Sequence, residues 1–159
     1  MILLLKNIVM EQIETTVDSQ FIKLYKNVLP PDLCSSMINT YEKLWREQEE
    51  QIKKMSLCYS EDGKKLCTAC DCQRLDIMQH HEFKESFNQV IGRFEFLISQ
   101  YKKDVVIHDC QWPKTYRYEN FRVKRFLCNE KQQHDTHVDV TNTDTAKRFL
   151  AFVCYLNDD

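Results

Sequence analysis

The amino-acid sequence predicts an α+β fold in which helices come first and strands later. Two segments, 31–55 and 83–101, repeat apolar residues at the spacing of one helix face, whereas 105–128 and 148–156 are rich in strand-forming residues. A chain with this order separates its helical part from its sheet, which is the α+β arrangement. Its 159 residues correspond in size to a single domain.

The first helix is expected to follow an extended segment at 21–30. Pro31 suits the first turn of a helix, and the Asp32 carboxylate is favoured there by the positive end of the helix dipole. The residues that follow helical spacing in this segment are Leu33, Met37, Tyr41, Leu44, Trp45, Gln48, Ile52 and Met55. The apolar stripe of the second helix consists of Phe83, Phe87, Val90, Ile91, Phe94, Leu97, Ile98 and Tyr101.

The remaining segments contain loop and strand signals. Residues 56–73 form a polar, cysteine-rich loop, and RLDIM at 74–78 is a short strand candidate. Side chains alternate in ENFRVKRFLC, as they do on a strand with two different faces. Residues 148–156 are apolar on both faces and are therefore expected to form a central strand with a neighbour on each side.

The composition argues against nucleic-acid and membrane-surface functions. The formal net charge is −2, so no strong attraction to phosphate groups is expected. The apolar start MILLLKNIVM is too short for a membrane span and lacks the features of a signal peptide, and translation could begin at Met10 instead. We therefore expect a cytoplasmic protein without nucleic-acid or membrane partners, whose 8 cysteines are reduced thiols.

His137 and Asp139 are the leading metal-ligand candidates. In an extended segment, residues two apart lie on the same face, so the imidazole and the carboxylate can bind one metal ion together. Such a pair supplies two of the three ligands of the 2-His-1-carboxylate triad, which holds non-haem Fe(II) and leaves positions open for other ligands. The alternative is that both residues are polar groups of a loop that binds no metal.

The sequence around this pair resembles the prolyl-4-hydroxylase-like branch of the Fe(II)/2-oxoglutarate dioxygenases. In that family an HxD motif is followed by an Arg-led strand that ends in Tyr-Leu-x-Asp. The matching residues here are Arg148, Tyr155, Leu156 and Asp158, and the resemblance covers about residues 120–159.

The resemblance implies a fold and an activity. The expected fold packs N-terminal helices on a partial double-stranded β-helix, or jelly roll, with residues 1–104 as the helical support and 105–159 as the first jelly-roll strands. The expected activity is hydroxylation of a prolyl residue, another amino-acid residue or a small substrate. The implied cofactors are Fe(II), 2-oxoglutarate and ascorbate, and the implied partners are a small-molecule cosubstrate and a peptide or amino-acid substrate.

The chain departs from the family pattern at several positions. In the family, the third iron ligand and the Arg or Lys that binds 2-oxoglutarate lie further along the chain than residue 159. We therefore expect the N-terminal part of such an enzyme, a single incomplete oxygenase domain. Cys128 stands where the family often has a tyrosine that contacts 2-oxoglutarate, and Phe126 is the nearest aromatic residue. His134 is a substitute third ligand, a residue of the site wall or a solvated loop histidine, and the last two are favoured over the first.

Cys67, Cys70 and Cys72 form a second cluster, in the string CTACDC. A Cys-x-x-Cys pair can hold one edge of a tetrahedral Zn(II) site, with Cys72 or the histidines at 80 and 81 as further ligands. The same spacing occurs in redox pairs and in surface loops that merely contain thiols. A second class of function therefore stays open, a non-catalytic zinc-stabilised binding module or a truncated relic of an oxygenase.

Overall fold

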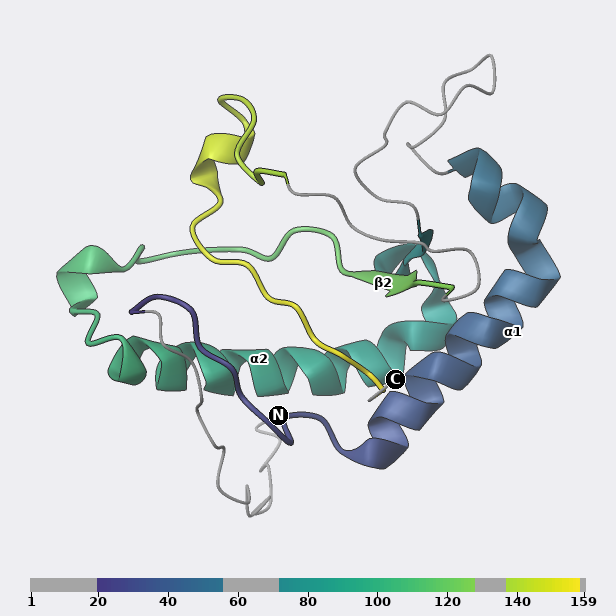
Figure 1. Ribbon diagram of the computed structural model, residues 1–159, viewed down its shortest axis with the longest axis horizontal. Helices are drawn as coiled ribbons and strands as arrows, with labels where there is room; N and C mark the ends of the chain where they lie inside the picture. The colour runs from purple at the N-terminus through teal and green to yellow at the C-terminus, as the bar shows by residue number, and fades with distance from the viewer. Residues whose placement is uncertain (1–19, 56–71, 128–136, 158–159) are drawn as a thin grey trace.

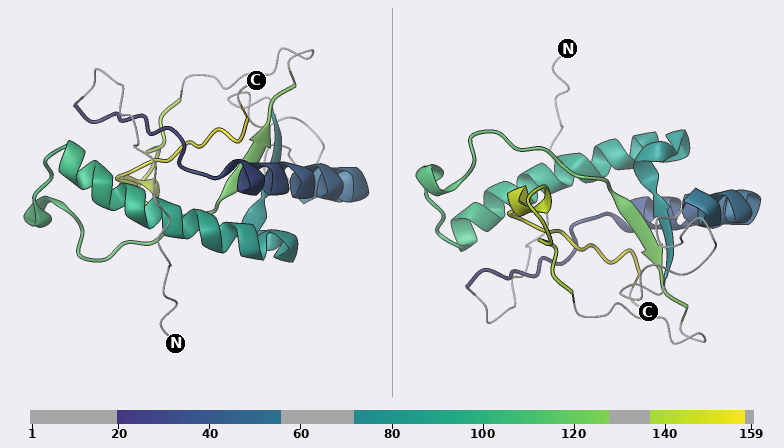
Figure 2. Two further views of the ribbon diagram at one scale, coloured as in Figure 1. Left: turned by 90° about the horizontal axis from the view of Figure 1, so that it is seen from below. Right: turned by 90° about the horizontal axis from the view of Figure 1, so that it is seen from above.

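The computed structural model describes residues 20–55, 72–127 and 137–157, although for residues 51–55 it describes the backbone alone. Figure 1 shows the long helices meeting at an angle, with extended segments that run alongside the horizontal helix. Figure 2 shows the same elements from below and from above, with a small sheet beside the meeting point of the helices. The helices therefore make up most of the regular structure in the described residues.

α1 (Pro31–Met55) and α2 (Lys84–Asp104) confirm the two predicted helical segments. Asp32 lies in the first turn of α1, where the helix dipole favours a negative charge. Lys102 and Lys103 lie in the last turn of α2, where the dipole favours positive charges. Among the residues that the structure describes, no helix combines the length and the apolar character needed to cross a membrane.

α2 ends in a Schellman motif that places Val106 in the left-handed region, with φ 57°. The N–H of Ile107 donates to the carbonyl of Lys102 at 2.9 Å, and the N–H of Val106 donates to the carbonyl of Lys103 at 3.2 Å. Glycine usually occupies this position, because a β-branched residue is strained at positive φ. The Val106 residue is 72% exposed, so burial does not offset the strain.

β1 (Gln73–Asp76) and β2 (Arg122–Arg125) form a two-stranded antiparallel sheet. Their register places Leu75 opposite Val123. Leu75 is buried and Val123 is half-buried, so one face of the sheet packs toward the helices. The predicted strand candidate at 74–78 is confirmed in part, because its second half turns into a short 3-10 helix at Ile77.

Arg125, at the end of β2, joins the sheet to α1. Its guanidinium donates to the Gln73 side chain and forms an ion pair with Glu42. The same group lies over the rings of Tyr41 and Trp45, at 5.4 Å and 5.7 Å from their centroids. Cation–π contact and hydrogen bonding therefore act together at one side chain.

The hydrophobic core lies between the two helices and the sheet. Apolar stripes of both helices face it, as the helical spacing predicts. Phe83 is fully buried just before α2 begins. The buried members of the core are Leu33, Met37, Tyr41, Leu44, Trp45, Leu75, Ile77, Phe83, Val90, Phe94 and Leu97.

The predicted jelly roll is wrong. In the described residues the sheet has only the strands β1 and β2, and it does not close on itself. Residues 148–156, predicted as a central strand, form no regular strand and run over α2 (Figure 1). A jelly roll needs strands with strand neighbours, whereas this segment takes a helix as its neighbour.

The segment 149–157 contacts the helical core through two side chains, Phe152 and Leu156. The Phe152 ring stacks on the Phe94 ring of α2, with centroids 4.8 Å apart and an interplanar angle of 15°. Leu156 also packs against the core, whereas Val153 and Tyr155 are each 81% exposed. The segment is therefore left uncovered at Val153 and Tyr155, whereas a central strand would be covered on both faces.

Candidate metal-binding site

His137 and Asp139 lie in a loop and not on a strand. The distance between His137 Nε2 and Asp139 Oδ1 is 3.4 Å, and the two side chains are 43% and 57% exposed. Ligands about 2.1 Å from a metal ion and at right angles to each other would be about 3 Å apart. The pair therefore needs only a small movement to hold one cation between its nitrogen and its oxygen.

The loop that follows Asp139 is shaped by hydrogen bonds between side chains and backbone. Asn142 Oδ1 accepts from the N–H of Asp144 at 3.1 Å and from the N–H of Thr145 at 3.0 Å. Thr145 Oγ1 accepts from the N–H of Thr141 at 2.9 Å and from the N–H of Asn142 at 3.0 Å. These Asx-type and Thr-type turns arise directly from the short polar residues of the string TNTDT.

Arg148 closes this loop at its other end. Its Nη1 donates to the backbone carbonyl of Asp139 at 2.5 Å. Its Nε donates to both carboxylate oxygens of Glu119, each at 2.9 Å. The hydrogen bond from Arg148 holds the pKa of the Glu119 carboxyl below its usual value. The resemblance predicts that Arg148 begins a core strand. In this structure its side chain instead connects the loop to the segment around Glu119.

Aromatic rings anchor the segments on both sides of this ion pair. Phe149 packs edge-on against Trp112 and Tyr116, with centroid distances of 5.1 Å and 6.1 Å. The hydroxyls of Tyr116 and Tyr118 donate to the Glu95 carboxylate of α2 at 2.9 Å and 2.7 Å. Burial, reinforced by Glu95, raises the pKa of both phenols. The loop is thereby connected to α2 through packed rings.

The donor set of the loop suits a divalent cation. Imidazole nitrogen and carboxylate oxygen are ligands that Fe(II) accepts in facial-triad sites. Within residues 20–55, 72–127 and 137–157, no group of three or more His, Cys, Asp and Glu side chains converges. His137 and Asp139 therefore form a pair without a third such side chain in these residues, and their role as iron ligands stays a prediction. His134, Cys128 and Asp158 lie outside the described residues.

The cysteine cluster falls mostly outside the described residues. Cys67 and Cys70 are not described, and Cys72 is a half-buried thiol. His80 is half-buried, whereas the His81 side chain is 91% exposed and lies 3.4 Å from a carboxylate oxygen of Glu82. The zinc site stays a prediction.

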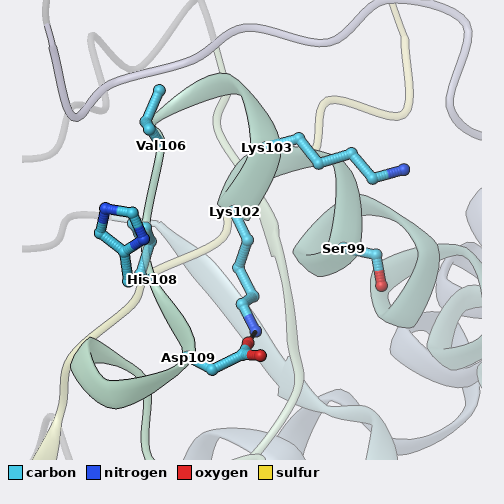
Figure 3. A pocket seen from close by; sticks show the side chains of 7 residues that line it. Ser99, Lys102, Lys103, Val106, His108 and Asp109 are labelled. Carbon is cyan, nitrogen blue, oxygen red and sulfur yellow. Dashed lines mark hydrogen bonds and ion pairs between the residues drawn. The ribbon is translucent and has the colours of Figure 1, made fainter.

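A separate open hollow of about 520 Å³ lies where α2 ends (Figure 3). Lys102 Nζ is 3.0 Å from Asp109 Oδ1 within it, and Figure 3 shows Lys103 pointing away from that pair. No predicted site residue lines the hollow, whose lining is Ser99, Lys102, Lys103, Val106, Ile107, His108 and Asp109. Sequence reasoning missed it, because its shape depends on the turn around Val106.

No family model, curated protein or solved structure matches the chain. Two sets of contacts beside the loop were not predicted from the sequence. They are the ion pair of Arg148 with Glu119 and the packing of Phe149 on Trp112 and Tyr116. Their only sequence signal is the resemblance that drew attention to Arg148.

Proposed function

We propose that this chain supplies the His137 and Asp139 ligands of the mononuclear iron site in an Fe(II)/2-oxoglutarate-dependent oxygenase. The observation that supports the proposal is the 3.4 Å approach of His137 Nε2 to Asp139 Oδ1 in a loop with defined hydrogen bonding. These hydrogen bonds, with that from Arg148 to the Asp139 carbonyl, restrain the main chain on the Asp139 side of the pair, which reduces the ordering needed when a cation binds.

The residues of the loop have distinct roles in this proposal. His137 would bind the cation through Nε2, and the Asp139 carboxylate would offset part of the charge of the cation. The exposure of both side chains leaves space for further ligands. When bound, Fe(II) with 2-oxoglutarate and O₂ supplies the oxidising chemistry for hydroxylating a C–H bond, and ascorbate sustains such turnover.

The substrate we propose is a prolyl residue, another amino-acid residue or a small molecule. Within residues 20–55, 72–127 and 137–157, no third His, Cys, Asp or Glu side chain joins His137 and Asp139. Two protein ligands hold a divalent cation weakly, so weak Fe(II) binding by this pair is expected. We also propose a cytoplasmic location for the protein.

Anaerobic titration calorimetry with Fe(II) tests the proposal. The parent chain, His137→Ala, Asp139→Ala and the control His81→Ala are compared, because His81 is an exposed histidine of another segment. We expect the two loop variants to lose the binding heat and the control to keep it. Equal Fe(II) affinity in His137→Ala, Asp139→Ala and the parent would reject the site, and loss of binding in His81→Ala would direct attention to the cysteine cluster.

A further inference from the structure

We infer that Arg148 is a positioning residue for the Asp139 ligand, and that Glu119 keeps the Arg148 guanidinium off the Asp139 carboxylate. The inference rests on the proposed function, because it concerns the same metal site. It goes beyond that function by assigning a role to two residues that are not metal ligands.

Arg148 contacts the backbone of Asp139 and not its carboxylate. An arginine beside an aspartate ordinarily pairs with the carboxylate itself, often through two parallel hydrogen bonds. Here Nη1 of Arg148 donates to the backbone carbonyl of Asp139 at 2.5 Å. The hydrogen bond therefore restrains the main chain of Asp139, whereas its carboxylate has an oxygen 3.4 Å from His137 Nε2 and no ion pair of 4.0 Å or less with Arg148. A guanidinium on that carboxylate would compete directly with a cation.

Glu119 determines which way the guanidinium faces. Both of its carboxylate oxygens accept from Nε of Arg148 at 2.9 Å. This contact orients the planar guanidinium, so that Nη1 reaches the Asp139 carbonyl. It also balances the positive charge of Arg148, which would otherwise repel a metal ion at the neighbouring ligands.

Both partners of the ion pair lie next to anchored residues. Phe149 follows Arg148 and packs on Trp112, and Tyr118 precedes Glu119 and donates to Glu95 of α2. The ion pair therefore connects two segments that are each held by packing. Supporting contacts of this kind orient metal ligands, and removing one typically weakens metal affinity about 10-fold to 100-fold.

Mn(II) binding to the full chain, followed by the paramagnetic resonance signal of free Mn(II), tests the inference. The variants are Arg148→Gln, Glu119→Gln and the double variant, with Lys147→Gln as the control for loss of a neighbouring positive charge. Arg148→Gln is expected to weaken binding about 10-fold to 100-fold. Glu119→Gln is expected to weaken it about 10-fold, because the released guanidinium can turn onto the Asp139 carboxylate.

The double variant shows most clearly whether Glu119 acts on metal binding through Arg148. Without the Arg148 guanidinium, Glu119 has nothing to restrain, so the double variant should bind Mn(II) no more weakly than Arg148→Gln alone. Arg148→Lys should not restore binding, because an ammonium lacks the planar fork that reaches Glu119 and the Asp139 carbonyl together. Lys147→Gln should leave the affinity within about twofold of the parent.

Two results separate this inference from the proposed function. Parent-like affinity in Arg148→Gln, or additive losses in the double variant, would overturn the positioning role while His137-dependent binding persists. Mn(II) binding that is absent from the parent, or unchanged in His137→Ala, would overturn the proposed function and this role with it. Amide hydrogen exchange of residues 139–148 is measured in parallel, and faster exchange in Arg148→Gln is the expected sign that the loop has opened.

Discussion

Val106 is the residue whose substitution should most clearly stabilise the chain. It occupies the left-handed position after α2 with φ 57° and is exposed. The left-handed conformation costs an L-residue roughly 1–2 kcal/mol, and glycine avoids this cost at the price of a more flexible unfolded chain. We expect Val106→Gly to raise the free energy of unfolding by about 1 kcal/mol, measured by urea denaturation.

Asn27 provides the matched control, because it also has φ 57°. Asparagine tolerates the left-handed region better than valine does, so Asn27→Gly should change the stability by no more than a few tenths of a kcal/mol. If Val106→Gly lowers the stability, or if both substitutions give the same gain, the strain assigned to Val106 is absent.

The residues of the candidate site were predictable to different degrees. His137 and Asp139 follow from a local spacing, which is visible in the sequence. Arg148 reaches Glu119 across 29 positions of the chain, and local pattern reasoning cannot show such a contact. The turn preferences of Asn and Thr could have predicted the turns at Asn142 and Thr145, but these turns were not predicted.

At the scale of elements, Arg125 should be essential for holding β2 against α1. Lysine retains the charge but can neither form the hydrogen bonds to Gln73 and Glu42 together nor stack its head group on Tyr41 in the same way. We expect Arg125→Lys to lower the free energy of unfolding by about 1–3 kcal/mol in urea denaturation. Arg122→Lys, at the exposed other end of β2, should change it by less than about 0.5 kcal/mol. Equal effects would show that the contacts of Arg125 do not stabilise the fold.

The segment 149–157 should be released from α2 by one substitution. Phe152→Ala removes the ring that stacks on Phe94 and should lower the free energy of unfolding by about 2 kcal/mol, less than for a fully buried ring. Amide exchange should accelerate in 149–157 and remain slow in the middle of α2. Val153→Ala is the control, because Val153 is exposed. Unchanged exchange in Phe152→Ala would contradict the docking of this segment on α2.

At the scale of the whole molecule, four tyrosines make the stability sensitive to alkali. Burial raises the pKa above the ordinary value of 10.0 in Tyr25, Tyr41, Tyr116 and Tyr118. Since the folded state holds these protons more tightly, the stabilisation is complete below about pH 10 and declines as the pH rises through the folded values. We expect the urea midpoint to fall above about pH 10, and to fall less steeply in Tyr118→Phe. A midpoint that stays constant or rises up to about pH 11 would contradict the raised pKa values.

The whole fold was only partly predictable from the sequence. The two helices follow from the spacing of residues such as Leu44 and Phe94, because helix periodicity is local. The pairing of β1 with β2 joins residues about 50 positions apart, as Leu75 and Val123 illustrate, and such pairing leaves no local signal. The jelly roll was inferred from residues 120–159, whose apolar faces indicate burial but not the kind of neighbour that provides it.

The central claim is that His137 and Asp139 hold a divalent cation, and paramagnetic broadening by Mn(II) in nuclear magnetic resonance spectra tests it most directly. Signals of residues 137–141 should broaden first as Mn(II) is added, whereas signals of Cys72 and His108 should stay sharp. The broadening should disappear in His137→Ala. Broadening centred on another segment, or broadening of 137–141 that persists in His137→Ala, would contradict the claim.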